Sequence, residues 1–254
     1  ENRQGAQQYG CRQPQPAQCP KRRLRRSFAR HFQLPGESQS EARYTVWLDL
    51  TQWAMESRVR REISRIFRES ARVKRQFLRD HATRLGQAIE LITEALRSGH
   101  KLMLFGNGGS AADAQHIAAE FVNRFKMERP PLPAIALTTD SSALTSIAND
   151  YSYNDVFAKQ VEALGQTGDV AVAISTSGNA VNVLRAVKAC KRRGMHVMAL
   201  TGGNGGKLAQ VADLVVCVDA TKETARIQET HILIAHTICE LVDEELFGTR
   251  SRKK

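Results

Sequence analysis

The 254-residue chain is poor in aromatic side chains and has no hydrophobic run long enough to cross a bilayer. Aromatic residues make up 6% of the sequence, and both tryptophans lie within residues 1–54. A membrane-spanning helix needs about 20 apolar residues in a row, and the N-terminus lacks the apolar centre of a secretory signal. We therefore predict a cytoplasmic protein without a membrane span.

Cysteine is scarce, and its spacing is unlike that of a disulfide framework. The five cysteines are odd in number and form no Cys-x-x-Cys pair. Cys190, Cys217 and Cys239 lie in apolar periodic segments, which predicts reduced side chains in the core. Reduced cysteines are typical of a protein from a reducing compartment.

The central part of the chain lacks a positive excess, although the whole sequence carries a formal charge of +11. Residues 1–54 hold nine Lys or Arg against four Asp or Glu, and residues 249–254 add four basic groups. Residues 55–248 retain 24 basic and 22 acidic side chains. Because nucleic-acid binding needs a basic surface, we expect no nucleic acid to bind the folded domain.

The first 54 residues differ in composition from the rest. They are rich in Gln, Arg and Pro, and they show no sustained helical or strand period before Tyr44. Such a segment cannot bury enough apolar surface to order itself, which predicts a disordered basic extension. The basic run at 21–26 is interpreted as a solvated charge cluster, with an interaction arm as the alternative. Met55 opens the helix-like sequence and is a plausible translation start, and residues 249–254 form a basic tail.

Residues 55–248 are predicted to form one α/β domain that opens with a helical hairpin. Apolar residues recur at helical spacing over 59–77 and 85–96, and Gly99 suits a helix C-cap. Five short apolar runs follow, at 101–105, 134–137, 170–174, 196–200 and 214–218, and a last helix is predicted at 222–246. Strands that alternate with helices predict a doubly wound, parallel five-stranded sheet, with the ligand site at the carboxyl ends of its strands.

Two loops rich in glycine and serine follow predicted strands. Residues 106–110 read Gly-Asn-Gly-Gly-Ser, and residues 175–179 read Ser-Thr-Ser-Gly-Asn. The glycines allow close ligand approach, and the following helix offers orphan N–H groups and the positive end of its dipole. The pair predicts one phosphorylated ligand held from two sides, although such turns also cap helices in other α/β proteins. A dinucleotide site is a weaker alternative, because Asp140 lies too far along the chain and is typical of a helix start.

Histidine and carboxylate side chains follow the first loop. His116 and Glu120 are four residues apart and share one helix face. Further polar side chains on the last helix are Gln228, Glu229, His231 and His236. Two histidines and a carboxylate suit Zn²⁺ with an open position for substrate, or an acid–base pair without metal. A purely structural role for the histidines is the remaining alternative.

Taken together, these segments resemble the bacterial phosphoheptose isomerases. The similarity spans about residues 55–247 and rests on motifs in the same order, at 105–110, 113–116, 129–136, 148–150, 174–179, 199–202 and 226–229. It implies a sugar isomerase domain that converts sedoheptulose 7-phosphate to D-glycero-D-manno-heptose 7-phosphate through an enediol. The product would serve lipopolysaccharide or surface-glycan synthesis. The resemblance also implies one Zn²⁺ per subunit and a homotetramer, and the apolar helix faces favour an oligomer.

The resemblance also implies site residues. Its metal positions fall on His116, Glu120, Gln228 and His236. Its substrate contacts fall on Asn107, Gly108, Gly109, Ser110, Glu120, Asn149, Asp150, Ser175, Thr176, Ser177 and Gln228. Glu120 is our choice for the carbon base and His236 for the opposing proton carrier, although the two roles are interchangeable. Gln228 and His236 are about 12 Å apart along a helix axis, so the sequence leaves open whether both reach one ion.

The chain departs from the family at Ala180, where well-known members have a serine. One phosphate-binding hydroxyl is therefore absent.

The main alternative function is that of a non-catalytic protein of the same superfamily, which associates with a bacterial replication initiator. That family shares the Arg-Pro-x-Leu-Pro-Ala-Ile-Ala and Arg-Ile-Gln-Glu segments with this chain. An interaction module needs neither Glu120 nor His236. Their presence favours an enzyme, an aldose–ketose isomerase.

Overall fold

The computed structural model describes the backbone of residues 39–248 and the side chains of residues 55–248. The described residues belong to two units, which meet between Val59 and Arg60. The basic tail and the first 38 residues of the predicted extension lie outside the described residues. Between residues 39 and 248, none of the helices has the length and hydropathy of a membrane span.

The first element is one continuous helix, α1 (Gln39–Arg97). The predicted helical hairpin is therefore wrong. The helix continues because residues 55–97 contain no proline and only one glycine, Gly86, which a helix tolerates. Residues 39–54, which we expected to be disordered, also belong to α1. This segment has neither glycine nor proline, so its helix propensity opposes the composition-based prediction.

All five predicted strands are present and form one parallel sheet in the order β2-β1-β3-β4-β5. Their bounds are β1 (Leu102–Gly106), β2 (Ala134–Ala136), β3 (Val170–Ser175), β4 (His196–Gly202) and β5 (Leu214–Val218). The register pairs Gly106 with Ile174 and Ser175 with Thr201. The carboxyl ends of the three central strands therefore lie side by side, and the predicted fold class is confirmed.

The remaining elements connect these strands. They are α2 (Gly109–Val122), α3 (Ser141–Asp150), the 3₁₀ turn η1 (Tyr153–Asp155), α4 (Val156–Leu164), α5 (Val181–Arg192), α6 (Leu208–Val211) and α7 (Thr224–Phe247). Asp140 caps α3, since its Oδ1 accepts a hydrogen bond from the N–H of Ala143 at 2.9 Å. The interpretation of Asp140 as a helix start is thus confirmed.

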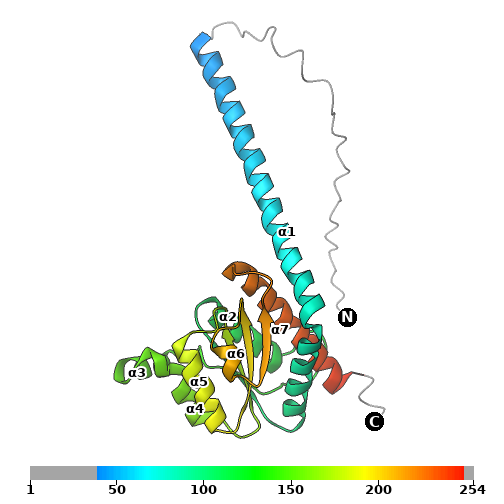
Figure 1. The fold of residues 1–254 in the computed structure, drawn as a ribbon, viewed down its shortest axis with the longest axis vertical. Coiled ribbons are helices and arrows are strands. Elements are labelled where there is room, and N and C mark those ends of the chain that lie inside the picture. The colour runs from blue at the N-terminus through cyan, green and yellow to red at the C-terminus, as the bar shows by residue number, and fades with distance from the viewer. Residues whose placement is uncertain (1–38, 249–254) are drawn as a thin grey trace, which may run out of the picture. The chain divides into compact units, whose positions relative to one another are not determined.

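Helices cover both faces of the sheet, with α4 and α5 on one side and α7 with the last part of α1 on the other (Figure 1). Because side chains alternate along a strand, Leu102 and Leu104 pack into the cluster that includes α1, α2 and α7. Met103 and Phe105 pack into the opposite cluster with α4 and α5. Both faces of the strands are buried, which explains their unbroken apolar runs. Helices α2 and α7 share one face, and this places their polar side chains together.

The three cysteines within the described residues are free. Cys190 and Cys239 are buried, and burial raises the pKa of each thiol to about 12. Both remain protonated at neutral pH and act as small apolar residues. The prediction of reduced core cysteines is confirmed for these two, whereas Cys217 is only partly buried.

Candidate active site

The first loop connects β1 to α2 and exposes backbone N–H groups at a helix start. Gly108 precedes α2 with a φ of 55°, a conformation that favours glycine. Gly106 has no room for a side chain, because a Cβ there would lie 2.8 Å from the carbonyl oxygen of Ile174. Ser110 is buried in the first turn of α2. The loop has the geometry of an anion-binding helix N-terminus.

The second loop follows β3 and rests on the loop that follows β4. Gly178, with a φ of 63°, packs directly against the carbonyl of Gly205. The carbonyl of Gly178 accepts a hydrogen bond from the N–H of Leu208 at 2.9 Å, and Oδ1 of Asn179 accepts one from the N–H of Lys207 at 3.1 Å. Contacts with the backbone of residues 205–208 therefore hold this loop in place.

The polar side chains of this loop differ in exposure. Ser175 is buried at the end of β3, Thr176 is half-buried and Ser177 is exposed. Ala180 follows at the N-cap of α5 and offers no side-chain acceptor to the helix. Ser177 is therefore the hydroxyl of this loop that is most open to solvent.

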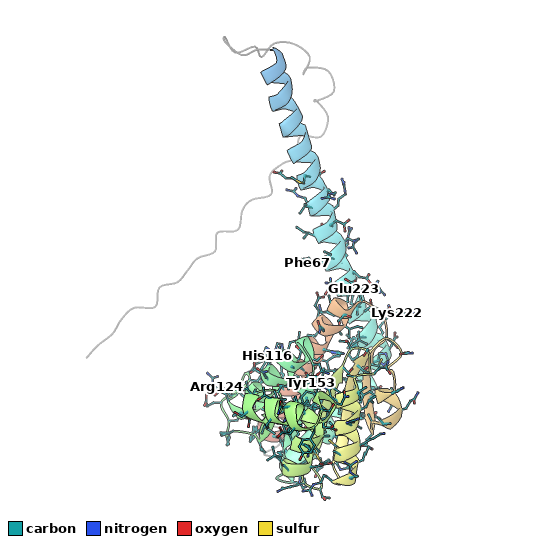
Figure 2. All side chains as sticks on the ribbon, turned by 90° about the vertical axis from the view of Figure 1, so that its left-hand side faces the viewer. Phe67, His116, Arg124, Tyr153, Lys222 and Glu223 are labelled. Carbon is teal, nitrogen blue, oxygen red and sulfur yellow. The ribbon has the colours of Figure 1, made fainter. Side chains whose placement is uncertain are left out.

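A pair of asparagines joins the two loops. The Nδ2 group of Asn107 donates to Oδ1 of Asn182, and Nδ2 of Asn182 donates to Oδ1 of Asn107, both at 2.8 Å. The hydroxyl of Tyr153, labelled in Figure 2, also donates to Oδ1 of Asn107, at 3.2 Å. Asn182 is buried in the first turn of α5. The sequence analysis missed Asn182 and Tyr153, because neither lies in a loop that reads as phosphate-binding.

Three side chains from α2 and α7 form a cluster whose potential ligand atoms all lie within 4.8 Å of one another. Nε2 of His116 lies 3.0 Å from Oε1 of Glu120 and 3.3 Å from Nε2 of His236. Figure 2 labels His116 on α2. Two imidazole nitrogens and one carboxylate oxygen form the donor set of a catalytic zinc site with an open position. The chemistry of these residues fits Zn²⁺.

The ring of Phe125 stacks on His236, with 5.4 Å between the ring centroids. Phe125 therefore packs against one face of the His236 imidazole, whose Nε2 contacts His116. We refer to His116, Glu120 and His236 as the His-Glu-His cluster.

The Gln228 amide contacts the first loop. A Cβ at Gly109 would lie 2.5 Å from Nε2 of Gln228, so only glycine leaves space for this side chain. Gln228 precedes His236 by eight residues of α7, and Gly109 precedes His116 by seven residues of α2. The two helices therefore run side by side in the same direction. This places Gln228 at the loop, and its role as a metal ligand stays a prediction.

Asn149 and Asp150 lie at the end of α3 and are exposed. Nδ2 of Asn149 donates to Oδ1 of Asp150 at 2.8 Å. Tyr153 follows three residues later and reaches Asn107, which connects this end of α3 to the first loop. Contact of Asn149 and Asp150 with the substrate stays a prediction.

Two titratable groups near the site have shifted pKa values. Burial raises the pKa of the Asp113 carboxyl on α2, while the nearby His116 opposes the shift. Burial lowers the pKa of His231 on α7 to about 4, and its Nε2 lies 3.0 Å from the carbonyl oxygen of Thr201. His231 is therefore a neutral imidazole that joins α7 to β4, and it lies outside the His-Glu-His cluster.

Known proteins are similar to this chain over most of its length. The SIS domain family matches residues 66–202. A phosphoheptose isomerase from Thermodesulfovibrio yellowstonii is 51% identical over 193 residues, 76% of this chain and 96% of that protein. One from Aquifex aeolicus is 54% identical over 183 residues, 72% of this chain and 95% of that protein. The structure of phosphoheptose isomerase from Neisseria gonorrhoeae matches with a TM-score of 0.69 and 48% identity, covering 73% of this chain and 99% of that one. The chain therefore belongs to the phosphoheptose isomerase family of SIS domain proteins.

Proposed function

We propose that this protein is an aldose–ketose isomerase that converts sedoheptulose 7-phosphate to D-glycero-D-manno-heptose 7-phosphate. The observation that carries the proposal is that His116 and Glu120 of the His-Glu-His cluster lie on α2, the helix that begins at the first loop. His116 lies six residues after Ser110, about 9 Å along the helix axis. A phosphate held at the loop would thus leave the other end of a sugar chain beside the cluster.

The phosphate would bind to the two loops at the carboxyl ends of β1 and β3. Ser110, Ser175, Thr176 and Ser177 supply hydroxyl groups, and Gly108 and Gly109 supply backbone N–H groups. Asn107, Asn149, Asp150 and Gln228 are proposed contacts for the sugar hydroxyls. With Ala180 in place of serine, the backbone and these remaining hydroxyls carry the anion.

Isomerisation requires one proton to move between C1 and C2 and another between their oxygens. Glu120 is half-buried, and its carboxylate is oriented by His116 at 3.0 Å, which suits a base that removes a proton from carbon. His236, whose Nε2 contacts the same nitrogen of His116 at 3.3 Å, would exchange the proton between the two oxygens. Carbon and oxygen protons are thus handled by groups from two different helices.

His116, Glu120 and His236 would hold one Zn²⁺ per subunit, with Gln228 as the proposed fourth ligand. Zn²⁺ bound there would supply Lewis-acid stabilisation to negative charge on the substrate oxygens. The same three side chains would orient the reacting end of the sugar.

We also propose a homotetramer in the cytoplasm, serving heptose synthesis for lipopolysaccharide or another surface glycan. Large apolar side chains are exposed on two helices, with Ile63, Ile66 and Phe67 on α1 and Leu233 and Leu241 on α7. Phe67 is 71% exposed, and such side chains favour a partner surface. Light scattering at micromolar concentration should give a tetramer, and a monomer would contradict the proposal.

The test of the activity is incubation of the purified full chain with sedoheptulose 7-phosphate, with and without added Zn²⁺. We expect the aldose product to form, and we expect Glu120→Gln to slow its formation by about 10²–10⁴-fold. Absence of product under both conditions would overturn the proposed activity. That result would favour the non-catalytic, initiator-binding alternative, which the presence of the complete His-Glu-His cluster disfavours.

A further inference from the structure

The guanidinium of Arg129 is buried at the C-terminal end of α2. Its Nε donates to Oδ1 of Asp243 on α7 at 2.7 Å, and the two side chains are 1% and 2% exposed. Its remaining hydrogen bonds go to the backbone carbonyls of Glu120 (2.9 Å), Phe121 (2.9 Å), Asn123 (3.2 Å) and Pro130 (3.1 Å). One side chain thus binds the last turn of α2 and, through Asp243, the adjacent helix.

Stability alone gives a weak reason for a buried ion pair. The desolvation of two charges offsets most of their attraction, and an apolar pair of similar volume is often as stable. Here one carboxylate oxygen of Asp243, Oδ2, has no hydrogen-bond partner among the described residues. The geometry of the pair, with its five donated hydrogen bonds, is more specific than packing requires.

Each member of the pair is connected to one of the two helices that carry the His-Glu-His cluster. Arg129 binds the carbonyl of Glu120 itself, and that residue's side chain belongs to the cluster. Asp243 follows His236 by seven residues, which is two helical turns and therefore the same face of α7. The pair thus sets how the last turn of α2 lies against α7, and these are the two helices that supply the cluster.

We propose that Arg129 and Asp243 are a positioning pair, which holds Glu120 on α2 and His236 on α7 at the separation that metal binding requires. The inference rests on the proposed metal-assisted function. Groups that orient metal ligands without touching the ion typically change metal affinity or activity by about 10–100-fold when they are replaced.

A second ion pair offers a matched control. Nζ of Lys126 lies 2.5 Å from Oε2 of Glu240, and the two side chains are 62% and 38% exposed. Lys126 and Glu240 each precede the corresponding member of the buried pair by three residues. The control joins the same two segments from the solvent side, without contacts to the carbonyls of α2.

The test compares the double variant Arg129→Met/Asp243→Leu with Lys126→Met/Glu240→Leu and the parent chain. Paired replacement avoids an unpaired buried charge, which would unfold the protein for unrelated reasons. Zn²⁺ affinity is measured by competition with a chromophoric chelator, the ligand geometry by the visible absorption of bound Co²⁺, and folding by thermal unfolding. Should the first double variant fail to fold, Arg129→Gln/Asp243→Asn keeps a donor and an acceptor in place without charge.

We expect the buried-pair variant to fold, to bind Zn²⁺ about 10–100-fold more weakly and to show an altered Co²⁺ spectrum. The exposed-pair variant should match the parent in all three measurements. Parental Zn²⁺ affinity and an unchanged Co²⁺ spectrum in a folded buried-pair variant would overturn the inference, and so would a parent chain that binds neither metal. If the parent chain has isomerase activity and the buried-pair variant binds Zn²⁺ as the parent does, the positioning role is refuted and the proposed function stands. If the parent chain has no isomerase activity but the buried-pair variant binds Zn²⁺ more weakly, the proposed function is refuted and the positioning role stands.

Discussion

His116 and His236 face each other through their Nε2 atoms at 3.3 Å, although 120 residues separate them in the chain. Two imidazole nitrogens at this distance repel each other if both are unprotonated acceptors, so the contact requires a shared proton or a shared cation. Oε1 of Glu120 lies 3.0 Å from the same nitrogen of His116 and adds negative charge. The three groups together have the donor atoms of a cation site.

The first prediction concerns metal content. His116→Ala removes the nitrogen that lies within 3.3 Å of both other ligand atoms, so we expect bound Zn²⁺ to fall to a small fraction of the parental amount. His196→Ala is the control, because His196 is exposed at the start of β4, the opposite end of that strand from the loops. Elemental analysis of the purified variants measures both. Equal zinc in the parent and in His116→Ala would assign His116 a structural role.

The second prediction concerns the carbon base. Glu120→Gln keeps the size of the side chain and removes its ability to accept a proton, so kcat should fall by about 10²–10⁴-fold with little change in KM. Glu162→Gln, in an exposed ion pair with Arg192 on α5, should leave kcat unchanged. Steady-state kinetics with sedoheptulose 7-phosphate distinguish the two. If Glu120→Gln still exchanges the carbon-bound hydrogen with deuterium from the solvent while His236→Gln does not, the two roles are reversed.

The third prediction concerns Asn182, which contacts Asn107 through two hydrogen bonds at 2.8 Å. Asn182→Ala leaves the half-buried amide of Asn107 partly unpaired, at a cost of about 1 kcal/mol. We expect KM for the sugar phosphate to rise by roughly tenfold while kcat changes less, because this loop is the proposed site of the phosphate and not of the reacting carbons. Tyr153→Phe removes one longer hydrogen bond and should raise KM less. A loss confined to kcat would place Asn182 at the reacting centre instead.

The fourth prediction concerns acid stability. Burial lowers the pKa of His231 to about 4, below its ordinary value of 6.5, so the unfolded chain binds a proton that the folded chain excludes. Because of this histidine, the free energy of unfolding decreases as pH falls from about 6.5 to about 4, by at most about 3 kcal/mol. His231→Gln retains a donor for the carbonyl of Thr201 without titrating in this range. The loss of urea resistance between pH 7 and pH 5 should be smaller in this variant than in the parent, and an equal loss would contradict the prediction.

The fold was predictable from the sequence where local pattern decides the structure. The five apolar runs became five strands because the sheet is buried on both faces, and the glycines of the two loops mark turns that other residues enter with strain. The hairpin was mispredicted because the break between two apolar patterns was taken as a break in the helix. With only Gly86 in that region, the helix continues.

The site was predictable only in part, because its geometry depends on pairs that are far apart in the chain. His116 and Glu120 share a helix face and were visible from spacing. Asn182 became informative only through Asn107, 75 residues away. Arg129 and Asp243 are 114 residues apart, and a single charged residue in a sequence does not reveal its buried partner.

The last prediction concerns the N-terminal segment. Within the described side chains, the buried core starts at Val73, and the carbonyl of Ile66 on α1 accepts a hydrogen bond from Nη1 of Arg226 at 3.1 Å. A chain that starts at Met55 keeps all of these contacts, so it should fold, assemble and turn over within about twofold of the full chain. A chain that starts at Lys74 loses Val73 and the 2.7 Å hydrogen bond from Ser70 to Glu229, and it should unfold at a lower temperature. Thermal unfolding, light scattering and the isomerase assay, run on all three chains, measure these outcomes. Loss of activity in the Met55 chain alone, with its fold intact, would assign residues 1–54 a function in the enzyme.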